Sequence, residues 1–250
     1  MRVDRTPSRW REGIDVVAAI AFIALCTVAV WALVTKPANT QARSGTAAVR
    51  APRSSPPPLP KEPIAIGGAA FRGAANAKVA IIAYSEFKCP YCGAFARDTF
   101  PTLAQKYLDT GKVRFVFRHF PLDTLHPFAR EAAKATVCAE RQGKFWKLHD
   151  LFFADQAGLD SARMSSAVKE IGLDPTQFSA CMGRDAASVV QLDQDSGQPL
   201  GITGTPTFFV GIIQSDSRVR LTERLGGAMP LQKFETSLDK ALKDVEAATK

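Results

Sequence analysis

The feature that most constrains the fold is a cysteine pair placed between a predicted strand and a predicted helix. Residues 79–84 (VAIIAY) form a continuous apolar run of strand length, which is typical of a strand buried on both faces. The sequence CPYC follows at 89–92 and opens a helix predicted over residues 90–109. Pro90 suits the first helical position, where its missing N–H costs nothing, so Cys89 is expected to be the N-cap. A buried strand followed by a helix in this way predicts an α/β fold.

The same position predicts redox chemistry for the two cysteines. The N-terminus of a helix offers free N–H groups and a partial positive charge, and both stabilise a thiolate at Cys89. Cys92 lies one turn further along, near enough to form a disulfide with Cys89. We therefore expect a catalytic pair in which Cys89 is an exposed, attacking thiol and Cys92 is a shielded, resolving thiol.

Two other interpretations of this pair find less support in the sequence. A structural zinc site needs two more soft ligands at matching spacing, but Cys138 and Cys181 stand alone, with no histidine within a few residues of either. Cysteines that only pack in a core would be unexpected at an exposed turn marked by a proline. We therefore expect no metal.

The rest of the chain after the cysteines predicts how the domain is built. A short apolar segment stands at 64–66. Strands are predicted at 113–117, 207–210 and 218–224, a long helical stretch at about 127–198, and a last helix from about 230. This order predicts an α/β sandwich interrupted by a helical block. Pro101 is expected to kink the helix that follows the cysteines.

An apolar segment near the start of the chain predicts a membrane anchor. Residues 16–34 (VVAAIAFIALCTVAVWALV) carry no charge, and as a helix they would span roughly 28 Å, close to the thickness of a bilayer core. Four arginines precede them, which by the positive-inside rule leaves residues 1–13 in the cytoplasm. We expect residues 14–34 to be a single-pass anchor in the inner or cytoplasmic membrane, with the catalytic domain on the periplasmic or extracellular side. A cleaved signal peptide remains the alternative, and Cys26 is expected to be an inert thiol.

A proline-rich linker is predicted between this anchor and the folded domain. Residues 35–63 hold 7 of the 16 prolines and almost no large apolar side chains, which favours an extended spacer. Residues 1–63 also hold 9 Lys or Arg against 4 Asp or Glu, so most of the net charge of +8 lies outside the predicted domain. The charge therefore does not indicate a nucleic-acid partner. The folded domain is expected over residues 64–250.

Four segments of this domain carry a family resemblance. In order, "FRGAANAKVAIIAYSEFKCPYCGAF" at 71–95, "RHFPL" at 118–122, "GKFWKLHDLFF" at 143–153 and "GITGTPTFFVG" at 201–211 resemble the DsbA-like branch of the thioredoxin superfamily. The resemblance implies a thioredoxin fold with a helical insertion at about 125–200 and thiol-disulfide exchange with exported cysteine-containing proteins. We expect no cofactor, a membrane redox partner that resets the pair, and a monomer, because no dimerisation domain is visible after the linker.

The resemblance also implies roles for residues outside CPYC. In this superfamily the proline before the late strand is cis and faces the cysteines, which implies a cis Thr205–Pro206 bond whose Thr205 backbone is free to pair with substrate. Many members of the branch carry a further cysteine pair, so a structural disulfide between Cys138 and Cys181 is expected, with two buried free thiols as the alternative.

The remaining charged residues near the motif are expected to have ordinary roles. Glu86 could accept the proton of Cys92 and Lys88 could favour the thiolate, but we expect both to be solvated. His119 is expected to satisfy backbone groups at a strand end, and His149 to be structural.

Two functions of other classes stay open at this point. One is a glutaredoxin-like module that holds an iron–sulfur cluster or glutathione through CPYC, and the other is a peptide-binding chaperone. The direction of electron flow is also open. Tyr91 stands where DsbA-like oxidases often carry histidine, so a less oxidising disulfide than theirs is expected.

Overall fold

The structure is a computed structural model that describes residues 56–248 of the chain. The predicted cytoplasmic segment 1–13, the anchor 14–34 and most of the linker 35–63 lie outside the described residues. Within residues 56–248, no helix is both long enough and apolar enough to span a bilayer.

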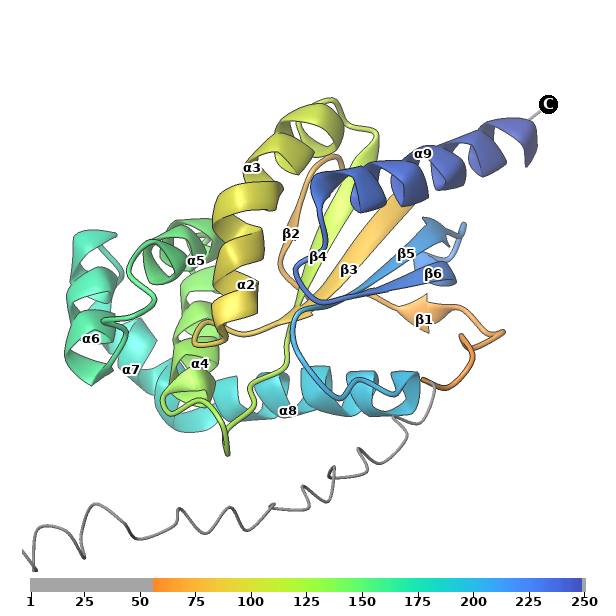
Figure 1. The fold of residues 1–250 in the computed structure, drawn as a ribbon. Coiled ribbons are helices and arrows are strands. Elements are labelled where there is room, and N and C mark those ends of the chain that lie inside the picture. Colours follow the sequence, from red (N-terminus) through yellow and green to blue (C-terminus); the bar gives the residue numbers. More distant parts are fainter. Residues whose placement is uncertain (1–55, 249–250) are drawn as a thin grey trace, which may run out of the picture. The chain divides into compact units, whose positions relative to one another are not determined.

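A six-stranded sheet forms the centre of the described domain (Figure 1), with the strand order β1-β6-β5-β3-β4-β2. Strands β3 and β4 run parallel, and the other neighbouring pairs are antiparallel. The strands are β1 (Ile64–Ala65), β2 (Phe71–Arg72), β3 (Val79–Ser85), β4 (Val113–His119), β5 (Thr207–Ile213) and β6 (Arg218–Gly226).

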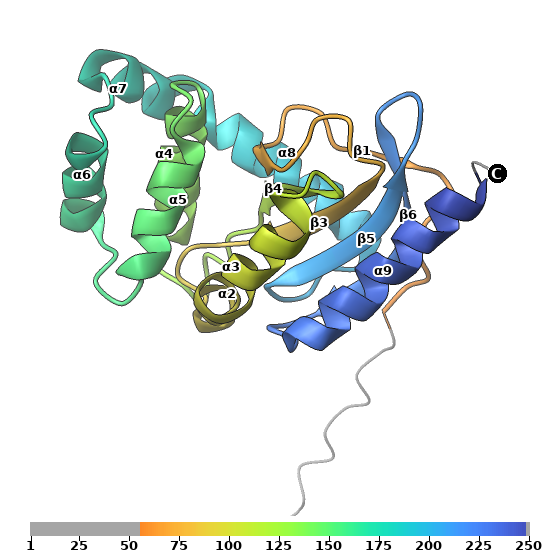
Figure 2. The same cartoon turned by 90° about the horizontal axis from the view of Figure 1, so that it is seen from above.

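The central strand β3 is buried along its whole length, as its unbroken apolar sequence predicts. Ile81 and Ala83 belong to the core on one face of the sheet, whereas Ile82 and Tyr84 belong to the core on the other, because successive side chains of a strand alternate. Helix α9 (Leu231–Ala248) and the helix after the cysteines cover the first face, and α8 (Ala186–Gly197) runs along the second (Figures 1 and 2). The sheet is therefore enclosed between two helical layers.

The helix after the cysteines is irregular on both sides of Pro101. It consists of α2 (Pro90–Ala94), the π-helical turn η1 (Phe95–Thr99), α3 (Phe100–Leu103) and a second π-helical turn η2 (Ala104–Leu108). The Phe100 N–H bonds to the Phe95 carbonyl, one residue further back than in an α-helix. Pro101 has no N–H to donate to the preceding turn. The irregularity expected at Pro101 thus takes the form of π-helical turns.

The chain between β4 and β5 forms the predicted helical insertion. In Figure 2, α4 to α7 lie together to one side of the sheet, and α8 leads back to it. The insertion contains α4 (Ala129–Glu140), α5 (Phe145–Ala154), α6 (Ser161–Glu170), α7 (Pro175–Arg184), α8 and the short η3 (Gln198–Leu200). The predicted α/β fold with a helical insertion is confirmed. The edge strands β1 and β2 were not predicted, because two residues are too few to show an alternating pattern.

Candidate active site

The two cysteines of CPYC lie where the chain leaves β3 and enters α2. Cys89 is the N-cap of α2 and has an extended backbone (φ −71°, ψ 121°), Pro90 opens the helix, and Cys92 lies in its first turn. Both cysteines are free thiols. Tyr91, between them, is 67% exposed. The local sequence therefore places the pair at a helix N-terminus, as predicted.

Cys89 is less accessible than predicted. It is 3% exposed, and Cys92 is 1% exposed. Residues 205–206, just before β5, lie against Cys89, whose thiol donates a hydrogen bond to the Thr205 carbonyl oxygen (Sγ–O 3.2 Å). The prediction of an exposed attacking thiol was wrong, because the sheet order brings the start of β5 beside the end of β3.

Thr205 and Pro206 lie where the resemblance places them, next to Cys89. Both are buried, and the peptide bond between them is cis. The Thr205 carbonyl accepts this hydrogen bond from the thiol form of Cys89, since a thiolate has no hydrogen to donate. Within residues 56–248, the Thr205 hydroxyl has no hydrogen-bond partner.

The two thiols have pKa values shifted in opposite directions. A hydrogen bond from the Cys92 thiol is the largest cause that lowers the pKa of Cys89 from its ordinary 9.0 to about 5. The backbone N–H groups of Cys92 and Tyr91 lower it further, and burial opposes them. Burial is the largest cause that raises the pKa of Cys92 well above its ordinary value, followed by its hydrogen bond to Cys89. At neutral pH the pair therefore holds one thiolate, on Cys89, and one thiol, on Cys92.

A fully buried carboxyl group lies beside this pair. Glu86 is 0% exposed, accepts a hydrogen bond from the Lys88 N–H (2.6 Å), and forms an ion pair with the half-buried His126. Burial is the largest cause that raises the pKa of Glu86, whereas the Lys88 N–H and His126 lower it. The Lys88 ammonium group is itself bound by two backbone carbonyls. The prediction that Glu86 is solvated was wrong, because its carboxyl group is fully buried where it meets His126. Lys88 is half-buried.

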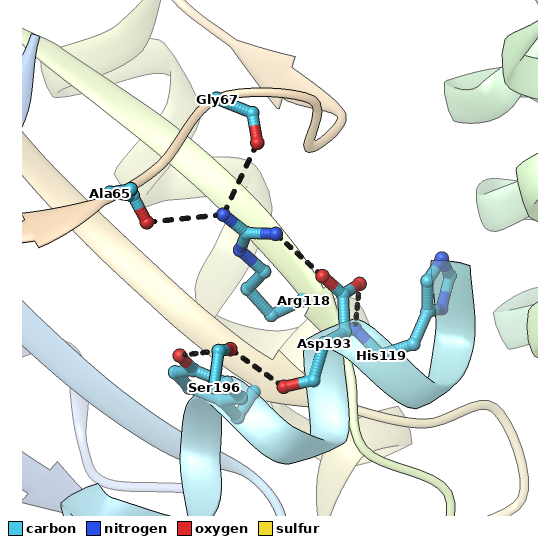
Figure 3. A network of polar contacts seen from close by, with 7 residues as sticks. Ala65, Gly67, Arg118, His119, Asp193 and Ser196 are labelled. Carbon is cyan, nitrogen blue, oxygen red and sulfur yellow. Dashed lines mark hydrogen bonds and ion pairs between the residues drawn. The ribbon is translucent and has the colours of Figure 1, made fainter. Parts of the chain in front are cut away.

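A second polar network ties β4 to α8 on the far side of the sheet (Figure 3). Asp193 accepts hydrogen bonds from the Arg118 guanidinium (2.6 Å) and from the His119 backbone N–H (2.9 Å). Arg118 also reaches the carbonyls of Ala65 and Gly67. This network joins the short strand β1, the strand β4 and the end of the insertion.

His119 does not play the predicted part in satisfying backbone groups. Its backbone N–H is satisfied by Asp193, and within the described residues its ring Nδ1 has no hydrogen-bond partner. Burial lowers the pKa of the His119 ring to about 4, so the ring is neutral. His149 is buried among aromatic rings, contacts Asp150 through Nδ1, and has a pKa lowered by burial.

The other two cysteines of the domain are joined. Cys138 on α4 and Cys181 on α7 form a disulfide that links two helices of the insertion, 43 residues apart in sequence. The bond lies in a small apolar cluster with Val137 and Val190. Among residues 56–248, no group of three or more His, Cys, Asp or Glu side chains is arranged to hold a metal ion.

Gln156 is the residue at this site that sequence reasoning missed. It lies in the loop after α5, 67 residues from Cys89, and its side-chain amide donates a hydrogen bond to the Cys89 carbonyl (2.7 Å). Its sequence context, "LFFADQAGLD", contains no spacing relation to CPYC. Only the packing of the insertion against α2 reveals this contact.

Taken together, the central sheet, the helical insertion and the CxxC pair beside a cis-proline define a thioredoxin-like protein. The chain belongs to the thioredoxin family, since the family model described as Thioredoxin matches residues 66–223. Among solved structures, it is similar to alpha-DsbA1 of Wolbachia pipientis (TM-score 0.65, 24% identity, 75% of this chain and 97% of that chain). It is also similar to the thiol-disulfide exchange protein alpha-DsbA2 of the same organism (TM-score 0.58, 20% identity, 69% and 86%).

Among curated proteins, the chain is similar to part of a protein named as a sodium/proton antiporter. A segment of 140 residues, 56% of this chain, is 37% identical to part of Na(+)/H(+) antiporter NhaA 3 of Salinispora tropica. The match spans 21% of that relative's length. The likeness therefore concerns a domain of the relative and not the whole of it.

Proposed function

We propose that this protein is a thiol-disulfide oxidoreductase that exchanges disulfides with exported cysteine-containing proteins through Cys89 and Cys92. The observation that carries the proposal is the pair of free thiols at one helix N-terminus, with the pKa of Cys89 lowered to about 5 and that of Cys92 raised. The thioredoxin family of the chain and its likeness to a thiol-disulfide exchange protein support it.

The pair can carry out exchange in two balanced steps. Starting from a Cys89–Cys92 disulfide, a substrate thiolate attacks the Cys89 sulfur, and the electron pair of the broken bond leaves on Cys92, which takes up a proton. A second substrate thiolate then attacks the substrate sulfur of the mixed disulfide, and Cys89 leaves as a thiolate. The substrate loses two electrons and gains a disulfide, and the cysteine pair is reduced.

The low pKa of Cys89 favours this oxidising direction. A thiol of low pKa is a good leaving group, so Cys89 is released readily from the mixed disulfide. We expect a reduction potential between those of DsbA, at about −120 mV, and thioredoxin, at about −270 mV.

The proposal places the domain outside the cytoplasm, tethered by residues 14–34 and reset by a membrane redox partner. The Cys138–Cys181 disulfide supports this, since such bonds persist in oxidising compartments. The apolar segment at 16–34 supports it, as does the occurrence of a similar domain within a protein named as an antiporter. We propose that the protein acts as a monomer.

Two assays test the function. The purified domain should oxidise a reduced, unfolded cysteine-containing protein and allow it to refold, and its equilibrium with glutathione should give a potential within the stated range. Cys89→Ala should abolish both activities. A Cys89→Ala variant that still promotes refolding as well as the wild type would instead indicate a peptide-binding chaperone.

A further inference from the structure

We propose that Gln156 is a positioning residue for the redox pair, which holds the segment before α2 so that the Cys89 sulfur faces its stabilising donors. The inference rests on the proposed function. It makes the loop after α5, which belongs to the helical insertion, part of the machinery that sets the reactivity of Cys89.

The Gln156 side chain binds the backbone just before α2 through two hydrogen bonds. Its amide nitrogen donates hydrogen bonds to the Phe87 carbonyl (2.9 Å) and to the Cys89 carbonyl (2.7 Å), on either side of Lys88. Lys88 donates hydrogen bonds in the opposite direction, from its ammonium group to the carbonyls of Gln156 (3.2 Å) and Ala157 (3.4 Å). The two segments are thus joined by four hydrogen bonds that cross between them.

The first turn of α2 is shaped to admit this side chain. A Cβ atom on Gly93 would collide with the Gln156 amide oxygen, so the glutamine packs directly over the backbone next to Cys92. Gly93 also donates its N–H to the Cys89 carbonyl (3.1 Å), which therefore receives two donors. The glycine leaves the space that Gln156 fills.

The hydrogen bonds from Gln156 hold the backbone that determines how the Cys89 thiolate is stabilised. The thiolate gains its stabilisation from the Cys92 thiol and from the N–H groups of Cys92 and Tyr91. These contacts depend on the extended backbone of Cys89, and Gln156 holds both carbonyls next to that backbone. Losing the hydrogen bonds from Gln156 should therefore move the pKa and the reduction potential as well as the stability.

The test compares Gln156→Met, which keeps the length and loses the donor, with the wild type. We expect the pKa of Cys89, measured from the pH dependence of iodoacetamide alkylation, to rise by about one unit. The glutathione equilibrium should shift about tenfold toward the disulfide form, which corresponds to about 30 mV toward a more reducing potential. Gln156→Asn keeps an amide but is one methylene too short to reach the carbonyls, so it should shift the pKa and the potential in the same direction. This variant replaces Gln156→Met in the test if the methionine variant does not fold.

Gln194→Met is the matched control. Gln194 is also half-buried and its amide also donates to a loop carbonyl, that of Pro121 (2.8 Å), but it lies on α8. We expect this control to lower the melting temperature without moving the pKa of Cys89. If the Gln156 variants lose stability while the pKa and the potential stay at wild-type values, Gln156 is only structural and the inference is refuted.

The alkylation readout separates this inference from the proposed function. A wild-type protein that cannot exchange disulfides would refute the function, yet a higher pKa of Cys89 in the Gln156 variants would still show that Gln156 positions the thiol. An active wild type with unchanged thiol reactivity in both Gln156 variants would refute the inference alone.

Discussion

Replacement of Cys92 by alanine or by serine tests the origin of the Cys89 thiolate. The hydrogen bond from Cys92 is the largest cause of the lowered pKa of Cys89. Serine keeps an O–H donor at this position, whereas alanine removes it. We therefore expect the pKa of Cys89 to remain near 5 in Cys92→Ser and to rise clearly in Cys92→Ala.

The size of the expected rise follows from the strength of such a bond. A hydrogen bond to a charged group contributes about 1.5–3 kcal/mol, and one pKa unit corresponds to about 1.4 kcal/mol, so alanine should raise the pKa by roughly one to two units. With a pKa of about 5, Cys89 is nearly all thiolate at pH 7. An ordinary thiol is only about a few per cent thiolate there, and it reacts correspondingly more slowly.

The measurement is the rate of alkylation by iodoacetamide between pH 3 and pH 9, with thiolate absorbance as a second probe. Cys89→Ser gives the background rate and absorbance, because it lacks the Cys89 thiol. A midpoint near about 8.5 in Cys92→Ser would refute the view that the structure stabilises this thiolate. Equal midpoints in the serine and alanine variants would show that the Cys92 donor is not responsible.

The same pKa makes the stability of the reduced protein depend on pH. Because the pKa of Cys89 is lower in the folded protein than in the unfolded chain, the stabilisation is complete above the unfolded value and is lost as pH falls through about 5. At pH 7, two units above the folded pKa, it amounts to roughly 2.7 kcal/mol. The oxidised protein has no such thiolate, so the melting temperature of the reduced form should fall relative to that of the oxidised form between pH 7 and pH 4. A constant difference would contradict the low pKa.

Three further predictions concern the supports of the site. Cys138→Ser should lower the free energy of unfolding by about 4 kcal/mol, from the loop of 43 residues that the disulfide closes, and leave the alkylation midpoint of Cys89 unchanged; denaturant titration and alkylation test this. His126→Ala should cost about 1–3 kcal/mol because it leaves the buried carboxyl group of Glu86 without the side chain that contacts it, and adding Glu86→Gln should recover much of that loss in the same titration. Asp193→Ala should cost about 3–5 kcal/mol by leaving the Arg118 guanidinium, 12% exposed, without its partner; a loss below 1 kcal/mol in thermal melts would contradict a tightly coupled network.

The sequence alone determines the features of this protein that depend on neighbours along the chain. The apolar run at 79–84 specifies a buried strand, and Pro90 specifies the start of a helix, so Cys89 falls at its N-cap without any help from distant residues. The division into an α/β core and a helical insertion follows in the same way, from the order of strand and helix patterns. The family resemblance added the pairing of Cys138 with Cys181 and the placement of Pro206, which no local pattern contains.

Only the tertiary structure decides which distant groups surround the two thiols. Glu86 looks like an exposed charge in the sequence, because its burial depends on the loop that carries His126. Gln156 meets Cys89 only because the insertion returns to the first turn of α2, and Cys89 is covered only because β5 lies beside β3. Periodicity and capping report short-range preferences of the backbone, whereas these contacts join residues more than 35 positions apart. Their partners are fixed by the order of the strands and by the packing of the helices on them.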